Sequence, residues 1–228
     1  MSRSLDVATS WLGSVLRFGA GLYAHAPASR PGKPLQLYEF EACPYCRKVR
    51  EALTELDLDA MIFPCPKGGR FRTLVEQRGG KAQVPYLVDP NTDIAMYESM
   101  DIIAYLRRTY DGGRSGYSLG LASTIGGSLV SGLRASSGRR VRAAKQPAEP
   151  LVLYSFEASP YCRIVRERLC ELELPYHLIN VGKRSPSRPA FVARSSKMMV
   201  PYLEDPNTGT RMFESADIVA YLDATYAA

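Results

Sequence analysis

The chain has 228 residues and a net charge of +6, and 46% of its residues are hydrophobic and 23% charged. This composition is typical of a globular protein with one large or two small domains. Five cysteines are too few and too irregularly spaced for a secreted disulfide framework, so we expect a reducing, cytoplasmic compartment. Two histidines without a His/Cys cluster at ligand spacing argue against a metal site built from this chain alone.

All of the excess positive charge lies in residues 1–33 and 111–149, so a nucleic-acid-binding face on a folded domain is not expected. Apolar residues at helical spacing within 5–22 and 117–133 predict a helical leader, and an apolar helix followed by a basic linker. Packing on the rest of the protein is expected, and peripheral membrane contact through 1–33 and 117–145 is the alternative. Neither a membrane span nor a secretory signal is predicted.

Residues 34–110 and 150–228 contain two copies of one sequence. About half of the positions are identical, in a register of 116 residues that holds without a gap. The landmarks of this register are the pairs Cys46/Cys162, Pro85/Pro201 and Glu98/Glu214. Chance does not produce such a match, so the sequence predicts a duplicated domain whose copies are small but large enough to fold.

Both copies predict the same elements in the same order. A strand (35–40; 151–156) leads into a turn and a helix, and a second strand (60–63; 176–180) and a second helix (69–79; 187–195) follow. A Val-Pro-Tyr-Leu segment opens a third strand, an Asp-Pro-Asn-Thr turn joins it to a fourth, and the last helix begins near Ser99 or Ser215. This βαβαββα order predicts an α/β fold with a mixed four-stranded sheet in each copy.

The first copy carries Cys43-Pro44-Tyr45-Cys46 at its strand-to-helix turn. Cys43 would lie at the helix N-terminus, where unpaired N–H groups and the helix dipole favour a thiolate. Cys46 lies one turn further on, close enough to form or resolve a disulfide. The pattern predicts a redox-active dithiol, and the alternative is a pair of buried, inert cysteines.

These motifs resemble those of a known family. The Cys-Pro-Tyr-Cys turn, the Val-Pro-Tyr-Leu segment and the Glu-Ser pair before the last helix are similar to glutaredoxins. They are closer still to the thioredoxin-fold N-terminal domain of glutathione S-transferases. The resemblance implies two tandem thioredoxin-like domains with glutathione as cosubstrate. A glutathione transferase continues into a large helical domain, whereas a second copy follows here, which argues against conjugation of bulky electrophiles.

The resemblance also implies roles for residues of the first copy. Cys43 would be the nucleophile that attacks a disulfide or a glutathionylated substrate, and Cys46 the resolving thiol. The implied glutathione-binding positions are Tyr45, Lys81, Val84, Pro85, Glu98 and Ser99. Val84-Pro85 matches the family's cis-proline, Glu98-Ser99 the pair that holds the γ-glutamyl end, and Lys81 or Arg78 would meet the glycyl carboxylate.

The second copy reads Ser159-Pro160-Tyr161-Cys162, so no disulfide can form within its motif. Some transferase classes use a serine here to stabilise the thiolate of glutathione, and Ser159 would do the same; the alternative is a copy that has lost its chemistry. The corresponding binding positions are Tyr161, Val200, Pro201, Glu214 and Ser215. Cys162 is expected to be packed rather than reactive.

Three functions follow from these patterns. The first is a glutathione-dependent thiol–disulfide oxidoreductase that acts on protein or small-molecule disulfides through Cys43. The alternatives are a non-catalytic tandem module that binds a partner, glutathione or a cofactor, and a transferase-like activity through Ser159. An iron–sulfur cluster held between two subunits is disfavoured by the dithiol and its proline.

Overall fold

The computed structural model describes residues 21–113, 138 and 140–228. The helices predicted within residues 5–22 and 117–133 lie almost entirely outside these residues. Residues 21–33, which we expected to belong to a helical leader, are irregular, because Pro27, Pro31 and Gly32 interrupt any helix there. Residues 140–149 form no helix or named strand and are mostly exposed.

The first repeat forms the predicted βαβαββα order. Its elements are β1 (Leu35–Glu39), α2 (Pro44–Glu55), β2 (Ala60–Pro64), α3 (Arg70–Gly79), β3 (Tyr86–Asp89), β4 (Ile94–Met96) and α4 (Ser99–Tyr110). β1 pairs with β2 in parallel and with β3 in antiparallel orientation, so the sheet is mixed. Ile102, Ile103, Tyr105 and Leu106 of α4 are buried.

The second repeat follows the same plan. Its elements are β5 (Leu151–Ser155), α6 (Pro160–Glu171), β6 (Tyr176–Asn180), α7 (Arg188–Ser195), β7 (Tyr202–Asp205), β8 (Thr210–Phe213) and α8 (Ser215–Tyr226). Both repeats are therefore thioredoxin-like α/β units, as predicted.

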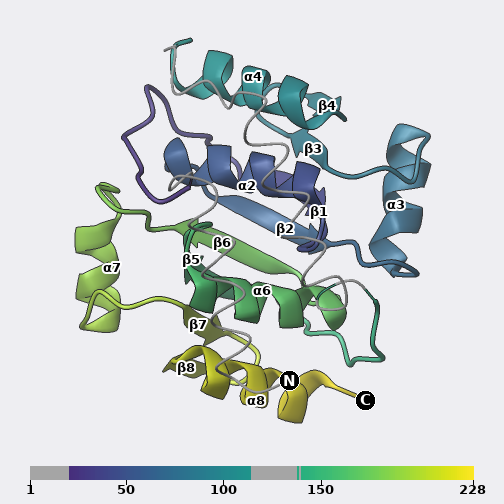
Figure 1. Cartoon of the computed structure of the whole chain (residues 1–228), viewed down its shortest axis with the longest axis vertical. Coiled ribbons are helices and arrows are strands. Elements are labelled where there is room, and N and C mark those ends of the chain that lie inside the picture. The colour runs from purple at the N-terminus through teal and green to yellow at the C-terminus, as the bar shows by residue number, and fades with distance from the viewer. Residues whose placement is uncertain (1–20, 114–137, 139) are drawn as a thin grey trace.

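The two four-stranded sheets join into one sheet of eight strands, in the order β4-β3-β1-β2-β6-β5-β7-β8. β2 and β6 pair in antiparallel orientation, with Met61 opposite His177 at the centre. An edge strand of each repeat is thereby covered by the other repeat. α2 and α6 lie side by side above this junction, while α3 and α7 lie at opposite sides of the molecule (Figure 1).

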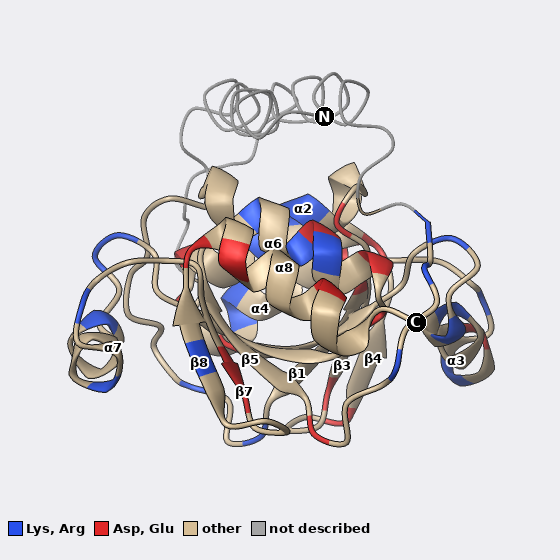
Figure 2. Cartoon of the chain, turned by 90° about the horizontal axis from the view of Figure 1, so that it is seen from below, with Lys and Arg blue, Asp and Glu red and all other residues tan. Residues whose placement is uncertain are grey.

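The continuous sheet separates one shared core from two local ones. Leucines of β1, β5, α2 and α6 form a single apolar cluster with residues of α4 and α8, so this core crosses the junction. On the other face, Phe71 of α3 packs on Phe63, and Phe191 of α7 packs on Tyr202. The two flanking helices lie far apart, α7 at the left and α3 at the right of the sheet in Figure 2.

A carboxylate fixes the same turn in each repeat. Asp89 ends β3, accepts hydrogen bonds from the hydroxyls of Tyr105 (2.6 Å) and Tyr110 on α4, and caps the turn through the N–H of Asn91 (2.8 Å). Asp205 repeats this with Tyr221, Tyr226 and Asn207. Each last helix is thus tied to the hairpin that precedes it.

Buried charges on α2 and α6, and in the segments that lead into them, join the two repeats. We call them the central charge cluster: Glu39, Glu41, Arg47, Arg50, Glu157, Arg163 and Arg166. Arg50 Nε donates to Glu157 Oε2 at 2.9 Å, and Arg166 Nε donates to Glu41 Oε2 at 3.0 Å, so arginines of each repeat pair with a carboxylate of the other. The coloured positions of α2 and α6 meet at the centre of Figure 2.

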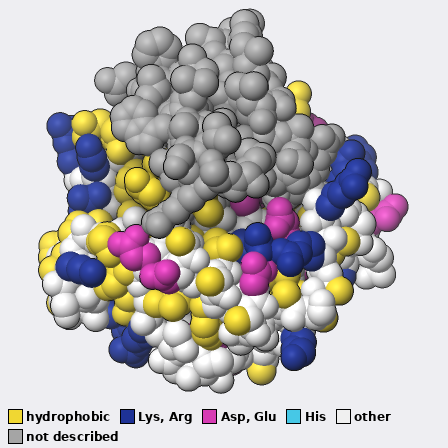
Figure 3. All heavy atoms as spheres, turned by 60° about the horizontal axis from the view of Figure 1, so that its bottom comes forward, with side chains coloured by type: hydrophobic (Ala, Val, Ile, Leu, Met, Phe, Trp, Pro, Cys, Tyr) yellow, Lys and Arg dark blue, Asp and Glu magenta, His cyan; other side chains and the backbone are white. Residues whose placement is uncertain are grey.

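The outer surface carries charges of both signs. On the face shown in Figure 3, Lys and Arg side chains stand in separate groups among acidic and apolar ones rather than in one patch. Within the part of the chain that the structure describes, no helix has the length and apolar character needed to cross a membrane.

Candidate functional site

Cys43 begins α2 as its N-cap residue. Its backbone is extended (φ −78°, ψ 122°), Pro44 follows at the first helical position, and Cys43 Sγ accepts a hydrogen bond from the N–H of Cys46 at 3.4 Å. A capping side chain satisfies N–H groups that the helix leaves unpaired. The cap is here a thiol, so the same N–H groups favour its thiolate.

The two thiols of the motif have opposite electrostatics. The hydrogen bond from the Cys46 side chain, with those from the backbone of Cys46 and Tyr45, lowers the pKa of Cys43 to about 6 against the cost of burial, and Arg50 assists. Burial raises the pKa of Cys46 well above its ordinary value, and the neighbouring Cys43 adds to this. Cys43 is the outer thiol, at 6% exposure, and Cys46 is fully buried.

The strand register brings the other predicted positions to the same end of the sheet. Tyr38 of β1 pairs with Tyr86 of β3, and Leu87 pairs with Met96 of β4. The segments just before β3 and just after β4 therefore lie beside the turn that carries Cys43. Val84-Pro85 is cis, as the resemblance implied.

Glu98 stands at the start of α4 in an unusual backbone conformation. Its φ is +65°, in the left-handed region that side chains other than glycine rarely adopt. Its exposed carboxylate accepts a hydrogen bond from Gln83 Nε2 at 2.7 Å, which ties it to the segment before β3. Ser99 is buried at the first position of the helix. Strained residues of this kind cluster at functional sites.

The remaining predicted positions of the first repeat differ in their surroundings. Tyr45 is 55% exposed beside Cys43, with Lys48 Nζ 5.8 Å from the centre of its ring. Lys81 is exposed, and its carbonyl accepts the hydroxyl hydrogen of Tyr97. Arg78, the alternative to Lys81, donates to the hydroxyl of Tyr38 at 2.7 Å and lies over that ring, so its guanidinium is already engaged.

The second repeat keeps the same frame around Ser159. Ser159 Oγ accepts from the N–H of Cys162 at 3.3 Å, and its φ and ψ (−74°, 120°) are close to those of Cys43. Val200-Pro201 is cis and Glu214 has φ +66°, matching the first repeat. Ser215 and Cys162 are buried, and Tyr161 is exposed.

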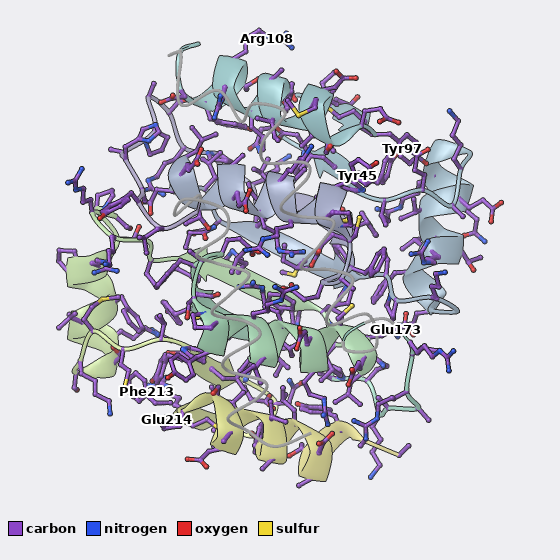
Figure 4. The ribbon with its side chains drawn as sticks, in the orientation of Figure 1. Tyr45, Tyr97, Arg108, Glu173, Phe213 and Glu214 are labelled. Atoms are coloured by element: carbon purple, nitrogen blue, oxygen red, sulfur yellow. The ribbon has the colours of Figure 1, made fainter. Side chains whose placement is uncertain are left out.

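The two sites lie far apart. β2 and β6 run antiparallel, so the N-termini of α2 and α6 point to opposite sides of the molecule. Tyr45 and Tyr97 mark the first site at one side, and Phe213 and Glu214 mark the second at the diagonally opposite side (Figure 4).

Sequence reasoning missed the central charge cluster, which reaches the first site through Arg50. Arg50 lies one turn after Cys46 on α2, is 2% exposed, and contacts Glu39, Glu41 and Glu157. A signal was present, because Glu41, Arg47 and Arg50 recur unchanged in the second repeat. Charged residues on an amphipathic helix ordinarily face water, so their recurrence did not by itself indicate burial.

Each repeat is thus a thioredoxin-like domain with a thiol or hydroxyl at the start of its first helix. The chain belongs to the glutathione S-transferase N-terminal domain family, whose model (Glutathione S-transferase, N-terminal domain) matches residues 37–114 and 153–228, more than half of the chain.

The chain is also similar to individual proteins. The glutathione S-transferase-like protein tpcF of Aspergillus fumigatus is 33% identical over 78 residues, which span 34% of this chain and 34% of that protein. The chain therefore covers about a third of that relative's length. Among solved structures, Leishmania TDR1, described as a unique trimeric glutathione transferase, matches with a TM-score of 0.30 and 16% identity, over 83% of this chain and 68% of that chain.

Proposed function

We propose that the chain is a glutathione-dependent thiol–disulfide oxidoreductase in which Cys43 is the nucleophile and Cys46 the resolving thiol. The observation that carries this proposal is the N-cap position of Cys43 with Cys46 directly behind it. A thiol with a pKa of about 6 is mostly thiolate at pH 7, whereas an unperturbed cysteine is only a few per cent thiolate.

The steps follow from the order of the two thiols. The Cys43 thiolate attacks a substrate disulfide, so one substrate sulfur leaves as a thiolate and the other forms a mixed disulfide with Cys43. Cys46 then attacks Cys43 and releases the second substrate thiol. Two glutathione molecules reduce the Cys43–Cys46 disulfide and leave as oxidised glutathione, which closes the cycle.

Family membership and the geometry around α4 support glutathione as the reductant. Glu98 presents an exposed carboxylate suited to the ammonium of a γ-glutamyl group, and the start of α4 suits its carboxylate. Val84 and Pro85 flank the same turn, beside which the cysteine of glutathione would lie. Tyr45 and Lys81 would border the remainder of the peptide.

The test is glutathione-coupled reduction of a small disulfide by single variants. Cys43→Ser is expected to lower the rate to that of the uncatalysed reaction, and Cys46→Ser to leave part of it for glutathionylated substrates, because glutathione itself can resolve their mixed disulfide. Ser159→Ala is the matched control at the equivalent N-cap and should retain the wild-type rate. Unchanged activity in Cys43→Ser would contradict the mechanism.

A second candidate function rests on the frame kept around Ser159. There the second repeat would bind glutathione, with Pro201, Glu214 and Ser215 as binding positions and Tyr161 and Val200 beside them, and the Ser159 hydroxyl would stabilise the glutathione thiolate. This predicts conjugation of a small electrophile that survives Cys43→Ser and is lost in Ser159→Ala. A non-catalytic tandem module would show neither disulfide reduction nor conjugation in the wild type.

A further inference from the structure

Within the central charge cluster, the correspondence between the repeats breaks at one position. The pairs Glu41/Glu157, Arg47/Arg163 and Arg50/Arg166 occupy equivalent positions in the central charge cluster. Glu39, the last residue of β1, has Ser155 as its counterpart at the end of β5. The repeat with the dithiol therefore buries a carboxylate that the repeat with Ser159 lacks at this place.

Glu39 lies in the same helix–sheet layer as Cys46. Side chains alternate along a strand, and Leu35 and Leu37 belong to the core beneath α2, so Glu39 faces α2 as well. There its carboxylate accepts a hydrogen bond from Arg50. Arg50 and Cys46 are four residues apart on α2, which places them on one face of the helix. Glu39 is 2% exposed.

Glu39 has fewer cationic partners than the other carboxylates of the cluster. Glu41 and Glu157 each form ion pairs with three arginines, whereas Glu39 pairs with Arg50 among the described residues. Burial raises the pKa of Glu39 to about 7; Arg50 and Arg166 oppose this rise, and Glu41 and Glu157 reinforce it. Four other titratable groups interact with Glu39. They are Cys46 on α2, Cys65 just after β2, Cys170 on α6 and Tyr176 on β6.

We infer that Glu39 accepts the proton of Cys46 when Cys46 resolves the mixed disulfide, and returns it when the disulfide is reduced. This rests on the proposed function, because it concerns the second step of that reaction. Cys46 needs such a partner because burial keeps its pKa far above neutrality. A buried carboxyl that titrates near neutral pH suits both directions of transfer.

The step balances without a further reactant. Glu39 carboxylate takes the proton from Cys46 Sγ, and the resulting thiolate attacks Cys43 Sγ. The Cys43–Cys46 bond forms, the bond from Cys43 to the substrate sulfur breaks, and the electron pair leaves on the substrate thiolate, which water protonates. In the reverse direction glutathione thiolate attacks Cys43, Cys46 leaves as a thiolate, and the carboxylic acid of Glu39 protonates it.

The second repeat takes part through Glu157, which acts on Glu39 as a positioning residue. Its carboxylate holds Arg50 Nε at 2.9 Å and Arg166 Nη2 at 2.8 Å, and thereby shares the guanidinium that Glu39 depends on. It also adds a negative charge next to Glu39. Both effects keep the proton on Glu39 at higher pH than in an isolated pair with Arg50.

The experiment isolates the resolution step in the full chain. Reduced protein is mixed with oxidised glutathione, quenched in acid, and the decay of the Cys43–glutathione adduct into the internal disulfide is followed by mass spectrometry between pH 5.5 and 8.5. In the wild type the decay rate should rise with pH and level off around a midpoint of about 7. Glu39→Gln should slow the decay about 100-fold at pH 7 and remove this midpoint.

Two further variants separate proton transfer from a structural role. Glu39→Asp keeps the carboxyl and should recover part of the rate with a pH midpoint still present. Glu167→Gln removes another buried carboxylate, which pairs with Arg163 on α6, and should leave the rate within about twofold of the wild type. Equal slowing by Glu39→Gln and Glu167→Gln would overturn the inference.

Glu157→Gln tests the contribution of the second repeat. It also keeps the inference testable if the Glu39→Gln protein does not fold. Removing this charge releases Arg50 toward Glu39, so the pH midpoint should fall by about half a unit or more. A wild-type decay rate that rises tenfold per pH unit throughout the range, with no midpoint, would overturn the inference without any variant.

Failure of the proposed function looks different. If the wild type forms no Cys43–glutathione adduct, the oxidoreductase proposal fails. If the adduct forms and resolves at the same rate in Glu39→Gln, only the role of Glu39 fails.

Discussion

The first and second repeats keep the same frame around their helix N-termini but not the same chemistry. Both have an N-cap side chain that accepts the N–H three residues on, a cis-proline before the third strand, and a glutamate at positive φ before the last helix. They differ at Cys43/Ser159 and Glu39/Ser155. The difference teaches that the scaffold of the site is maintained separately from its reactive groups, and under the proposed mechanism two buried positions would decide which repeat forms and resolves a disulfide.

The largest expected effect comes from replacing the arginines that pair with carboxylates of the other repeat. Arg50→Met leaves three buried carboxylates short of a partner and Arg166→Met leaves two, so both variants should lose stability. We expect about 3–5 kcal/mol by urea denaturation at pH 8, with Arg50→Met the more destabilised.

The difference between these two variants should narrow at pH 6. The pKa of Glu39 is raised to about 7, so its carboxyl is protonated at lower pH and no longer needs Arg50. In terms of linkage, a carboxyl with a raised pKa stabilises the fold below its unfolded pKa, and this contribution is lost as the pH rises through 7. A gap between the variants that stays constant from pH 8 to 6 would contradict this account of Glu39.

Moving the thiol from one repeat to the other tests whether the frames are equivalent. Cys43→Ser/Ser159→Cys should reduce disulfides about 100-fold faster than Cys43→Ser alone, because the N-cap geometry of Ser159 already favours a thiolate. The rate should stay below the wild type, since Ser155 supplies no carboxyl. Adding Ser155→Glu should narrow that difference; no activity in the double variant would show that the frames are not equivalent.

The turns held by Asp89 and Asp205 should lose the same stability when the aspartate is replaced. Asp89→Asn and Asp205→Asn each replace a carboxylate that accepts hydrogen bonds from two tyrosine hydroxyls. Each substitution should therefore lower the free energy of unfolding by about 2 kcal/mol at pH 7. Burial disfavours the carboxylates, but the hydrogen bonds outweigh it and lower both pKa values. The contribution is therefore present above about pH 4 and lost below it. Unequal losses of unfolding free energy, measured by denaturation, would show that the two turns do not contribute equally to stability.

The smallest expected effect is on glutathione binding. Glu98→Gln and Glu214→Gln should each weaken one site about tenfold, seen as two separable losses in calorimetric titration of the Cys43→Ser protein. Glu98 is held by Gln83, whereas Met199 occupies the corresponding position in the second repeat. We therefore expect the first site to be the tighter one before substitution. A single binding event that only Glu98→Gln affects would mean that the second repeat binds no glutathione.

Much of the fold was predictable because each element could be checked against its counterpart. The boundaries of β6 agree with the predicted strand, and the Asp-Pro-Asn-Thr turns and the starts of α4 and α8 lie where expected. The N-cap position of Cys43 and the cis bond of Val84-Pro85 also followed from sequence and resemblance.

The junction between the repeats was not predictable from one copy alone. The paired strands Ala60–Pro64 and Tyr176–Asn180 share no identical residue, although about half of the repeat is identical. Strands that face each other across a junction need to fit each other rather than resemble each other. Glu39 was missed for a similar reason, because a lone acidic residue ending a strand is ordinarily solvated.

Because the two repeats are in one chain, the groups buried at their junction need not be the same on both sides, as they must be between identical subunits. In a symmetric pair, every buried group appears twice, so a carboxylate beside one dithiol would need a second one across the axis. A glutamate in place of Ser155 would lie at Arg166, whose Nη1 now donates to Ser155 Oγ at 3.2 Å, and would add a further buried negative charge to the cluster. The covalent link lets one half hold an ionisable acid while the other holds the neutral hydroxyl of Ser155, so the carboxyl that the proposed proton transfer would use is buried once.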